Sequence, residues 1–554
     1  MERWTPKSLQ ALRAYSFDLF RHDLLAGITV GLVALPLAMA FAISSGVSPQ
    51  AGIYCAIVTG FLISALGGSS FQIGGPTGAF VVVVSAIIAK YGIDGLFMAT
   101  MMAGVILIVL GATGLGSTVK FIPQPVVVGF TNGIAVVIAS TQLRDLFGLR
   151  MESVPSDFIP KMQALFGAAS TWSPLATLLG LGSLGFLVLW RRLGSRVPGY
   201  ILVLVATTAL SAVAALPIET IGSRFGGIAG TLPTIVVPKF RADLVLTLLS
   251  PALTIAMLGA VESLMSAVVA DRLGGDRHNP NIELIAQGVA NIASPLVGGL
   301  PATGALARTA TNIRSGARTP VSGMIHAVTL LAVLLVAAPL ARYVPLAALS
   351  GILLMVAWQM GEWSEIPHLL KLPKADIAVW LVTFTLTVVA DLTVAVETGM
   401  ILAMLMFIRK VSRTTSVSAT ADDDREEARL HVLHDKQVPE YATVYRVYGP
   451  LLFGTTEALR RVTDHVHALP PIVILKLRHV TAMDATGLRA LEELADRLRR
   501  SGRELIVCGA QPQPAALMAS ADFHQHVGGE NVCANTAVAL ARAAALNASR
   551  QTAA

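Results

Sequence analysis

The 554-residue sequence has few charged residues, few aromatic residues and almost no cysteine. Charged residues make up 14% of the chain and aromatic residues 6%, whereas 54% is hydrophobic, which excludes an ordinary soluble globular protein. The three cysteines, Cys55, Cys508 and Cys533, have no metal-ligand spacing and are too few for a disulfide framework. No Gly-x-x-x-x-Gly-Lys-Ser/Thr loop, His-Glu-x-x-His motif or Cys-x-x-Cys pair occurs. We therefore expect no cofactor, no metal centre, no ATP hydrolysis and no enzymatic activity.

What the sequence does contain is a series of long apolar runs. They recur from Leu25 to Ile408 and predict a polytopic α-helical membrane protein of about fourteen spans. After residue 409 charges become frequent, and short strand-like and helical runs alternate, as in Pro471–Leu477, Leu488–Arg500 and Glu504–Cys508, which predicts a small α/β domain. We expect an N-terminal segment over 1–24, a transmembrane transport domain over 25–410, a linker over 411–438 and the α/β domain over 439–554.

The distribution of basic residues predicts the orientation in the membrane. An even number of spans places both ends of the chain on one side, and basic loops such as Arg191–Arg192 and Arg314–Arg318 lie on that side. We therefore expect both termini in the cytoplasm and the protein in the cell membrane, the inner membrane if the source is bacterial. The net charge of +7 does not indicate a nucleic-acid partner, because much of the excess flanks apolar runs.

Two short, glycine-interrupted segments indicate an internal repeat. Pro76-Thr77-Gly78-Ala79 matches Ala302-Thr303-Gly304-Ala305 at an offset of 226 residues, and Ile122-Pro123 matches Val344-Pro345 at an offset of 222. We expect two halves, about 25–216 and 250–408, with about seven spans each. Because seven is an odd number, the two halves must be inverted relative to one another in the membrane. The alternative is that the small residues only allow helices to pack closely.

Arg308 is the residue most indicative of function, because it lies in membrane-length apolar sequence directly after a glycine and proline cluster. A guanidinium at bilayer depth is costly and requires a function or a partner. We expect a short helix to begin near Thr303, with its N–H groups and Arg308 facing a pocket that attracts anions. The alternative is that Arg308 extends to the membrane interface. The predicted substrate-binding residues are Phe41, Thr77, Gly78, Ala79, Gly304, Ala305, Leu306, Ala307 and Arg308.

Glu262 is the clearest acidic residue within a predicted span, and Ser266 follows one helical turn later on the same face. Burial disfavours the charged form of a carboxyl, so Glu262 could carry a proton during transport. Together with the Ser266 hydroxyl, it could instead hold Na⁺. A third interpretation is a permanent ion pair between Glu262 and Arg308.

The C-terminal α/β domain contains the sequence Asp484-Ala485-Thr486-Gly487 between a strand and a helix. Asp484 or Thr486 can cap the start of that helix. A regulatory role through phosphorylation or nucleotide contact is the alternative, and a cytoplasmic protein could also bind this domain.

These features together resemble the sulfate permease (SulP) family of anion transporters over nearly the whole chain. The matching residues are Leu35-Pro36 with Phe41, Gly75-Pro76-Thr77, Glu262 with Ser266, Ala307-Arg308-Thr309 and Asp484-Ala485-Thr486-Gly487. The resemblance implies fourteen spans in an inverted repeat and a C-terminal STAS domain. It also implies a site between the third and tenth helices, an elevator-like motion and homodimers. In STAS relatives the hydroxyl residue before the motif glycine can be phosphorylated, and Thr486 occupies that position.

We therefore expect a secondary active transporter that takes up a small anion together with H⁺, sulfate first and bicarbonate or dicarboxylate next. Two alternatives stay open. One is a proton-coupled nucleobase transporter of the same fold, and the other is an anion sensor or scaffold that signals through the STAS domain without transport.

Overall fold

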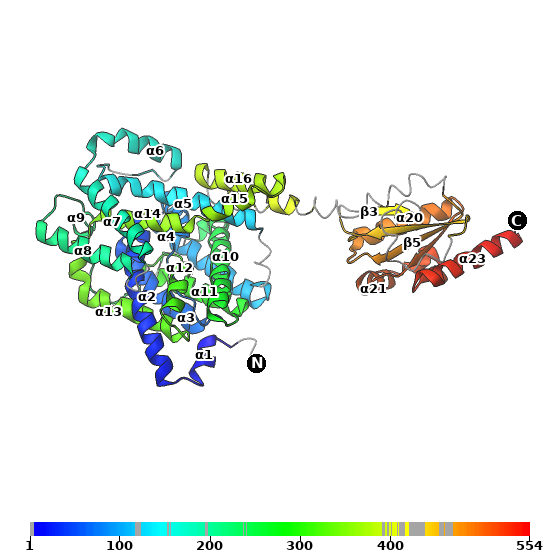
Figure 1. The fold of residues 1–554 in the computed structure, drawn as a ribbon, viewed down its shortest axis with the longest axis horizontal. Helices are drawn as coiled ribbons and strands as arrows, with labels where there is room; N and C mark the ends of the chain where they lie inside the picture. Colours follow the sequence, from blue (N-terminus) through cyan, green and yellow to red (C-terminus); the bar gives the residue numbers. More distant parts are fainter. Residues whose placement is uncertain are drawn as a thin grey trace. The chain divides into compact units, whose positions relative to one another are not determined.

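A computed structural model describes residues 5–116, 123–151, 154–155, 157–193, 198–235, 238–239, 241–390, 394–395, 398–399, 401–406, 408, 416–419, 438–453, 459 and 469–553. The chain divides into two compact units, Met1–Ile401 and Leu402–Ala554. The first is helical and the second is built around a β-sheet, as Figure 1 shows. Most of the expected linker, 411–438, lies outside the described residues, although one strand of the second unit, β3 (Ser416–Ala419), falls within it.

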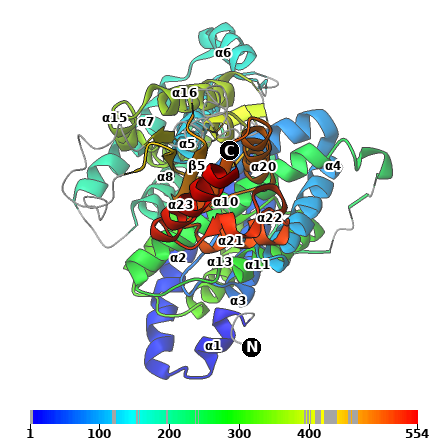
Figure 2. The same cartoon turned by 90° about the vertical axis from the view of Figure 1, so that its right-hand side faces the viewer.

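Helices make up most of the described part of the first unit (Figures 1 and 2). Eight stretches of its described part are long and apolar enough to cross a membrane, so the expected total of fourteen spans stays a prediction. The helices are α1 (Lys7–Leu12), α2 (Phe17–Ser44), α3 (Pro49–Leu66), α4 (Gly78–Ala112), α5 (Gln124–Phe147), α6 (Phe158–Gly167), α7 (Pro174–Arg192), α8 (Gly199–Ala214), α9 (Ile221–Phe225), α10 (Leu249–Gly274), α11 (Pro280–Ala293), α12 (Leu306–Arg314), α13 (Val321–Ala341), α14 (Leu346–Met360), α15 (Ile366–Leu369) and α16 (Lys374–Val389).

A helix boundary differs from the sequence-based expectation. The first long helix begins at Phe17 rather than near Leu25, because the Ser16 side chain accepts a hydrogen bond from the Leu19 amide and caps it there. It also continues through Pro36 without ending there. In α4, by contrast, Gly92 has a φ of 73°, so the chain bends there between two helical stretches of one longer element.

Packing separates these helices into two groups. The first helix group contains α2, α3, α4, α10, α11, α12 and α13, whose principal packing partners lie within the group. The second helix group contains α5, α7, α8, α14 and α16. Contacts between the groups are sparser and are made mainly by α2 and α4 against α5, α8 and α14. The first unit therefore consists of two bodies with a limited common surface.

The two halves of the chain supply equivalent elements to these groups. Both α5 and α14 begin directly after a proline, Pro123 and Pro345, at the offset of 222 noted above. The short strands β1 (Gly74–Gly75) and β2 (Thr303–Gly304) each precede a helix, α4 or α12. This correspondence supports the expected repeat.

The second unit is a five-stranded sheet with the order β3-β4-β5-β6-β7. Its other strands are β4 (Ala442–Tyr448), β5 (Ile472–His479), β6 (Glu504–Cys508) and β7 (Val532–Cys533); β3 pairs antiparallel and the remaining pairs are parallel. One face packs against α20 (Ala485–Arg500), α21 (Pro512–Ser520) and α22 (His524–Val527). The other face packs against α23 (Thr536–Ala553). The predicted α/β architecture is confirmed.

Asp484 caps α20, as one of the two interpretations of this motif predicted. Its Oδ1 accepts a hydrogen bond from the Gly487 amide at 2.8 Å, and its Oδ2 accepts one from the Phe453 amide at 2.8 Å. Thr486 lies exposed in the first turn of the same helix. The carboxylate therefore joins the helix start to the segment that follows β4.

We expect Asp484→Ala to destabilise the start of α20 by about 1–2 kcal/mol, because two backbone amides lose their acceptor. Hydrogen exchange of residues 485–500 in the full chain measures the effect as faster exchange. Thr486→Ala is the control and should leave the exchange nearly unchanged. Equal acceleration in both variants would contradict this role of Asp484.

Candidate functional site

The two glycine-interrupted segments meet in the first unit. Strands β1 and β2 pair antiparallel, with Gly74 opposite Gly304 and Gly75 opposite Thr303. Directly after them, α4 begins at Gly78 with Thr77 as its N-cap, and α12 begins at Leu306 with Ala305 as its N-cap. Two helix starts therefore lie next to one another, each with amide groups that no helical carbonyl can satisfy.

The second of these helices begins later than predicted, at Leu306 instead of near Thr303. The strand pairing explains the difference, because it holds Thr303 and Gly304 in extended backbone. The Gly304 amide donates to Ser263 Oγ at 3.1 Å, and the Ala305 amide donates to the Ile73 carbonyl at 2.8 Å. The amides of these two predicted anion donors are therefore already used within the protein.

Helix α10 holds β2 in position through one backbone carbonyl and one side chain. Thr303 Oγ1 donates to the Gly259 carbonyl at 2.9 Å and lies 2.6 Å from Ser263 Oγ. All three residues are buried. Ser263 is thus a supporting residue that the sequence interpretation missed, although it directly follows Glu262.

Arg308 is buried, with 2% of its surface exposed, so protein surrounds its guanidinium. Its Nη2 donates a hydrogen bond to the Pro76 carbonyl, so the side chain reaches from α12 to the segment that precedes α4. Its Nη1 is also buried and has no hydrogen-bond partner among the described residues. The guanidinium therefore joins the two broken segments and keeps one donor nitrogen available.

Glu262 lies half-buried on α10 and accepts a hydrogen bond from Thr77 Oγ1 at 2.9 Å. Thr77 is the N-cap of α4, so the carboxylate contacts the start of that helix. No ion pair joins Glu262 to Arg308 in the described part of the chain, where each has a different partner. A permanent pair between them, one of the interpretations above, is not what the structure contains.

Ser266 does not join Glu262 at a common ion site. Its side chain is buried, and its hydroxyl donates to Thr309 Oγ1 at 3.2 Å. Thr309 Oγ1 in turn accepts a hydrogen bond from the Ile73 amide at 3.1 Å. Ser266 therefore supports, through Thr309, the segment that leads into β1. This weakens the Na⁺ interpretation, which required an oxygen from Glu262 and one from Ser266 at the same site.

A cavity of about 700 Å³ lies against the helix starts, between the two helix groups. All predicted substrate residues except Gly304 line it. Of the two predicted coupling residues, Glu262 lines it and Ser266 does not. From the first helix group it is lined by Phe41, Thr77, Gly78, Ala79, Glu262, Ala305, Leu306, Ala307 and Arg308, among others. The second helix group contributes residues that the sequence interpretation did not select, including Phe130, Ile134, Tyr200, Gln359 and Met360.

The charges that line the cavity favour an anion. Three arginines, Arg191, Arg308 and Arg314, contribute to its wall together with two carboxylates, Glu262 and Glu362. Arg191 and Arg314 are exposed, whereas Arg308 is buried beside the helix starts. A negatively charged solute that enters would therefore meet its strongest field at Arg308, because burial removes the screening by water.

Comparison with known proteins identifies the family of the chain. The family model described as "Sulfate permease family" matches residues 20–383, and the STAS domain model matches residues 434–539. The chain belongs to the sulfate permease family. It is therefore an anion transporter with a C-terminal STAS domain, and a transporter rather than an enzyme.

The relatives carry names of two anions. The chain is 41% identical over 519 residues to the Bacillus subtilis protein named "Putative sulfate transporter YvdB", with 93% of this chain and 96% of the relative covered. It is 31% identical to the bicarbonate transporter BicA of Picosynechococcus, with 91% of each chain covered.

Solved structures show the same architecture. The transmembrane domain of a cyanobacterial BicA matches with a TM-score of 0.62 and 34% identity, covering 70% of this chain and 98% of that one. The structure of SLC26A9 matches with a TM-score of 0.87, covering 98% of this chain and 93% of that one. At 19% identity, this second likeness shows the fold alone. The predicted helical transporter fold with a C-terminal STAS domain is confirmed.

Proposed function

We propose that this chain takes up sulfate together with protons, and that the anion binds in the cavity between the two helix groups. The observation that carries the proposal is the convergence of two helix starts and one buried guanidinium on that cavity. Two positive helix ends and a cation at one place constitute an anion site without any metal. Sulfate is placed first because the relative at 41% identity is named for sulfate, and bicarbonate second because BicA is named for bicarbonate.

In this proposal the anion is held mainly by backbone amides. Gly78 and Ala79 supply them at the start of α4, and Leu306 and Ala307 at the start of α12. Arg308 adds a full charge from the same side through its unpartnered Nη1. Amides that are fixed by the strand pair need no reorganisation when the anion binds, which favours a doubly charged oxyanion over a neutral nucleobase.

The transport motion is proposed to be elevator-like. The helix starts, Glu262 and Arg308 belong to the first helix group, whereas Phe130, Tyr200 and Met360 face them from the second. Because contacts within each group are denser than contacts between them, the first group can slide against the second with the anion bound. We further propose cytoplasmic termini, residence in the cell membrane, homodimers and a regulatory role for Asp484 and Thr486 in the STAS domain.

Glu262 is proposed to carry the coupled proton. Its carboxylate already accepts a hydrogen bond from the N-cap of α4, so its charge acts directly on the amides that would hold the anion. A negative carboxylate beside an incoming anion raises the cost of binding, and a proton removes that cost. Anion and proton would therefore bind together.

Glu262→Gln is expected to make uptake independent of the pH gradient, because the amide resembles the protonated carboxyl at every pH. In proteoliposomes, radiolabelled sulfate uptake by the unaltered protein should rise several-fold with an inward proton gradient, and uptake by the variant should not. Glu362→Gln is the matched control, since Glu362 lines the same cavity from the second group. A gradient response that persists in Glu262→Gln would rule out this proton role.

Competition identifies the substrate class in the same assay. Unlabelled sulfate should reduce uptake most, followed by bicarbonate and a dicarboxylate, and uracil should have no effect. Inhibition by uracil would favour the nucleobase alternative. Sulfate binding with no flux under any gradient would favour the sensor or scaffold alternative.

A further inference from the structure

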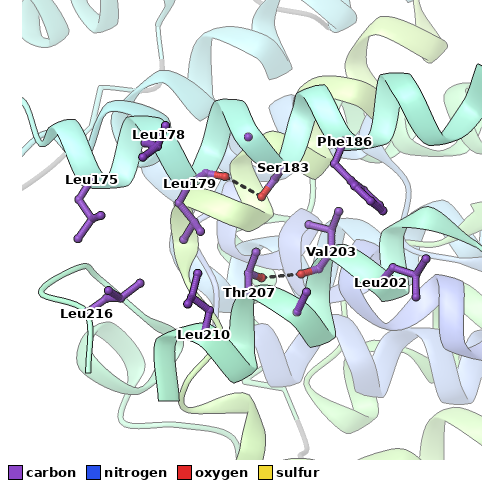
Figure 3. Close-up of a pocket in the computed structure, with 12 residues that line it drawn as sticks. Leu175, Leu178, Leu179, Ser183, Phe186, Leu202, Val203, Thr207, Leu210 and Leu216 are labelled. Atoms are coloured by element: carbon purple, nitrogen blue, oxygen red, sulfur yellow. Dashed lines mark hydrogen bonds between the residues drawn. The ribbon is translucent and has the colours of Figure 1, made fainter. Parts of the chain in front are cut away.

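A second cavity, separate from the anion site, lies between α7 and α8. Figure 3 shows that Leu175, Leu178, Leu179 and Phe186 on one helix face Leu202 and Leu210 on the other. Its volume is about 370 Å³. The two helices run antiparallel, so Phe186 and Leu202 mark one end of this groove and Leu175 and Leu216 mark the other.

The groove offers no free polar group to an occupant. Ser183 and Thr207 are its two hydroxyl residues. Ser183 Oγ donates to the Leu179 carbonyl at 2.7 Å, and Thr207 Oγ1 donates to the Val203 carbonyl at 2.7 Å, so each hydroxyl is satisfied within its own helix (Figure 3). The rest of the lining is apolar, apart from one glycine. The occupant must therefore be a hydrocarbon along this length.

The groove faces outward from the helix bundle. Only 22% of the most apolar stretch of α7 is buried in the structure, although the helix is long enough to span a membrane. Leu178 is 72% exposed and Leu210 is 50% exposed. In a bilayer these side chains face the acyl region, because no described helix covers them.

One end of the groove has the residues of a membrane interface. Helix α7 ends with Trp190, Arg191 and Arg192, and Phe186 stacks on Trp190 with ring centroids 5.3 Å apart. Tyr200 lies at the start of α8 on the same side. Aromatic rings and cations at a helix end are typical of the headgroup level. Arg191 lines the anion cavity, whereas Arg192 does not line it and is exposed.

We propose that this groove binds an acyl chain of an anionic phospholipid, with the lipid phosphate at Arg192. The apolar lining of the groove accepts the acyl chain, and the cation of Arg192 at one end favours a negatively charged headgroup. A second copy of this protein is a weaker candidate, because a symmetric contact here would bring two basic helix ends toward each other. The groove shares no lining residue with the anion cavity, so lipid binding there does not require the proposed transport mechanism.

Two glycines of α7 provide a matched pair of variants. Gly182 lines the groove, and Gly185 does not. A Cβ added at either position would have no heavy atom within 4 Å, so α7 should accept phenylalanine at either one. Gly182→Phe fills the groove, whereas Gly185→Phe adds the same ring elsewhere on the same helix.

Native mass spectrometry of the full chain, titrated in detergent with phosphatidylglycerol or phosphatidylcholine, measures lipid retention. We expect Gly182→Phe to retain one phosphatidylglycerol fewer than the unaltered protein and than Gly185→Phe. Arg192→Gln should retain phosphatidylglycerol about fivefold more weakly, the effect of one interfacial cation, with phosphatidylcholine unchanged. Equal retention in the two glycine variants would overturn the proposal. So would an unchanged lipid preference in Arg192→Gln, or loss of a dimer in Gly182→Phe without any loss of lipid.

Discussion

Arg308→Gln is expected to reduce sulfate uptake on the order of 100-fold, the effect of removing one buried, hydrogen-bonded charge from a binding site. The substitution removes the cation nearest the two helix starts. It also removes the Arg308 Nη2 group that donates to the Pro76 carbonyl. That hydrogen bond joins α12 to the segment before α4. Uptake into proteoliposomes and sulfate binding by calorimetry should both fall.

Two further variants show whether the effect depends on position or on charge alone. Arg314→Gln removes a cation from the wall of the same cavity, but Arg314 is exposed at the end of α12 and should matter only a few-fold. Arg308→Lys keeps the charge but cannot both bond Pro76 and face the anion, so it should recover part of the loss. Equal losses in Arg308→Gln and Arg314→Gln would contradict the central role given to Arg308.

The position of Arg308 could be predicted from the sequence because its chemistry conflicts with its surroundings. A guanidinium within apolar sequence is conspicuous, and the preceding Gly298-Gly299-Leu300-Pro301 cannot continue a helix. Glu262 was predictable for the same reason. Asp484 was predictable from local capping chemistry, because an aspartate between a strand and a helix start has few other roles.

The start of α12 could not be predicted to the residue. Thr303 and Gly304 pair with Gly75 and Gly74, which lie more than two hundred residues earlier in the chain. No local pattern encodes such a pairing, and a two-residue strand has no periodicity. The consequence for function is specific, since the amides of Gly304 and Ala305 become structural donors rather than anion donors.

Ser266 illustrates a similar limit. Its spacing of four residues from Glu262 places it one turn further along α10, but spacing does not determine which neighbour a side chain bonds. Thr309 on α12 is that neighbour. Likewise, Tyr200 and Met360 could not be selected from sequence, because the tertiary packing of α8 and α14 brings them to the cavity.

The glycines of the strand pair give the second large expected effect. Gly75 has a φ of 149°, a backbone conformation that favours glycine, and a Cβ there would lie 2.5 Å from Arg308 Nη1. A Cβ at Gly304 would overlap the side chain of Gln72. Gln72 is only 3% exposed, so its side chain cannot turn away to solvent. Either alanine should therefore push the helix starts or Arg308 out of position.

We expect Gly75→Ala and Gly304→Ala each to lower sulfate uptake at least about 10-fold, the consequence of 1–3 kcal/mol of overpacking concentrated at the site. Gly259→Ala is the matched control, because the nearest atom to its added Cβ is Phe80 Cζ at an ordinary 3.7 Å. That variant should transport almost normally. Uptake and thermal stability are measured on the same preparations, so a loss of folded protein is separated from a loss of binding. If Gly304→Ala transports as well as Gly259→Ala, the strand pair does not position the anion site, and the arrangement of amides proposed here is wrong.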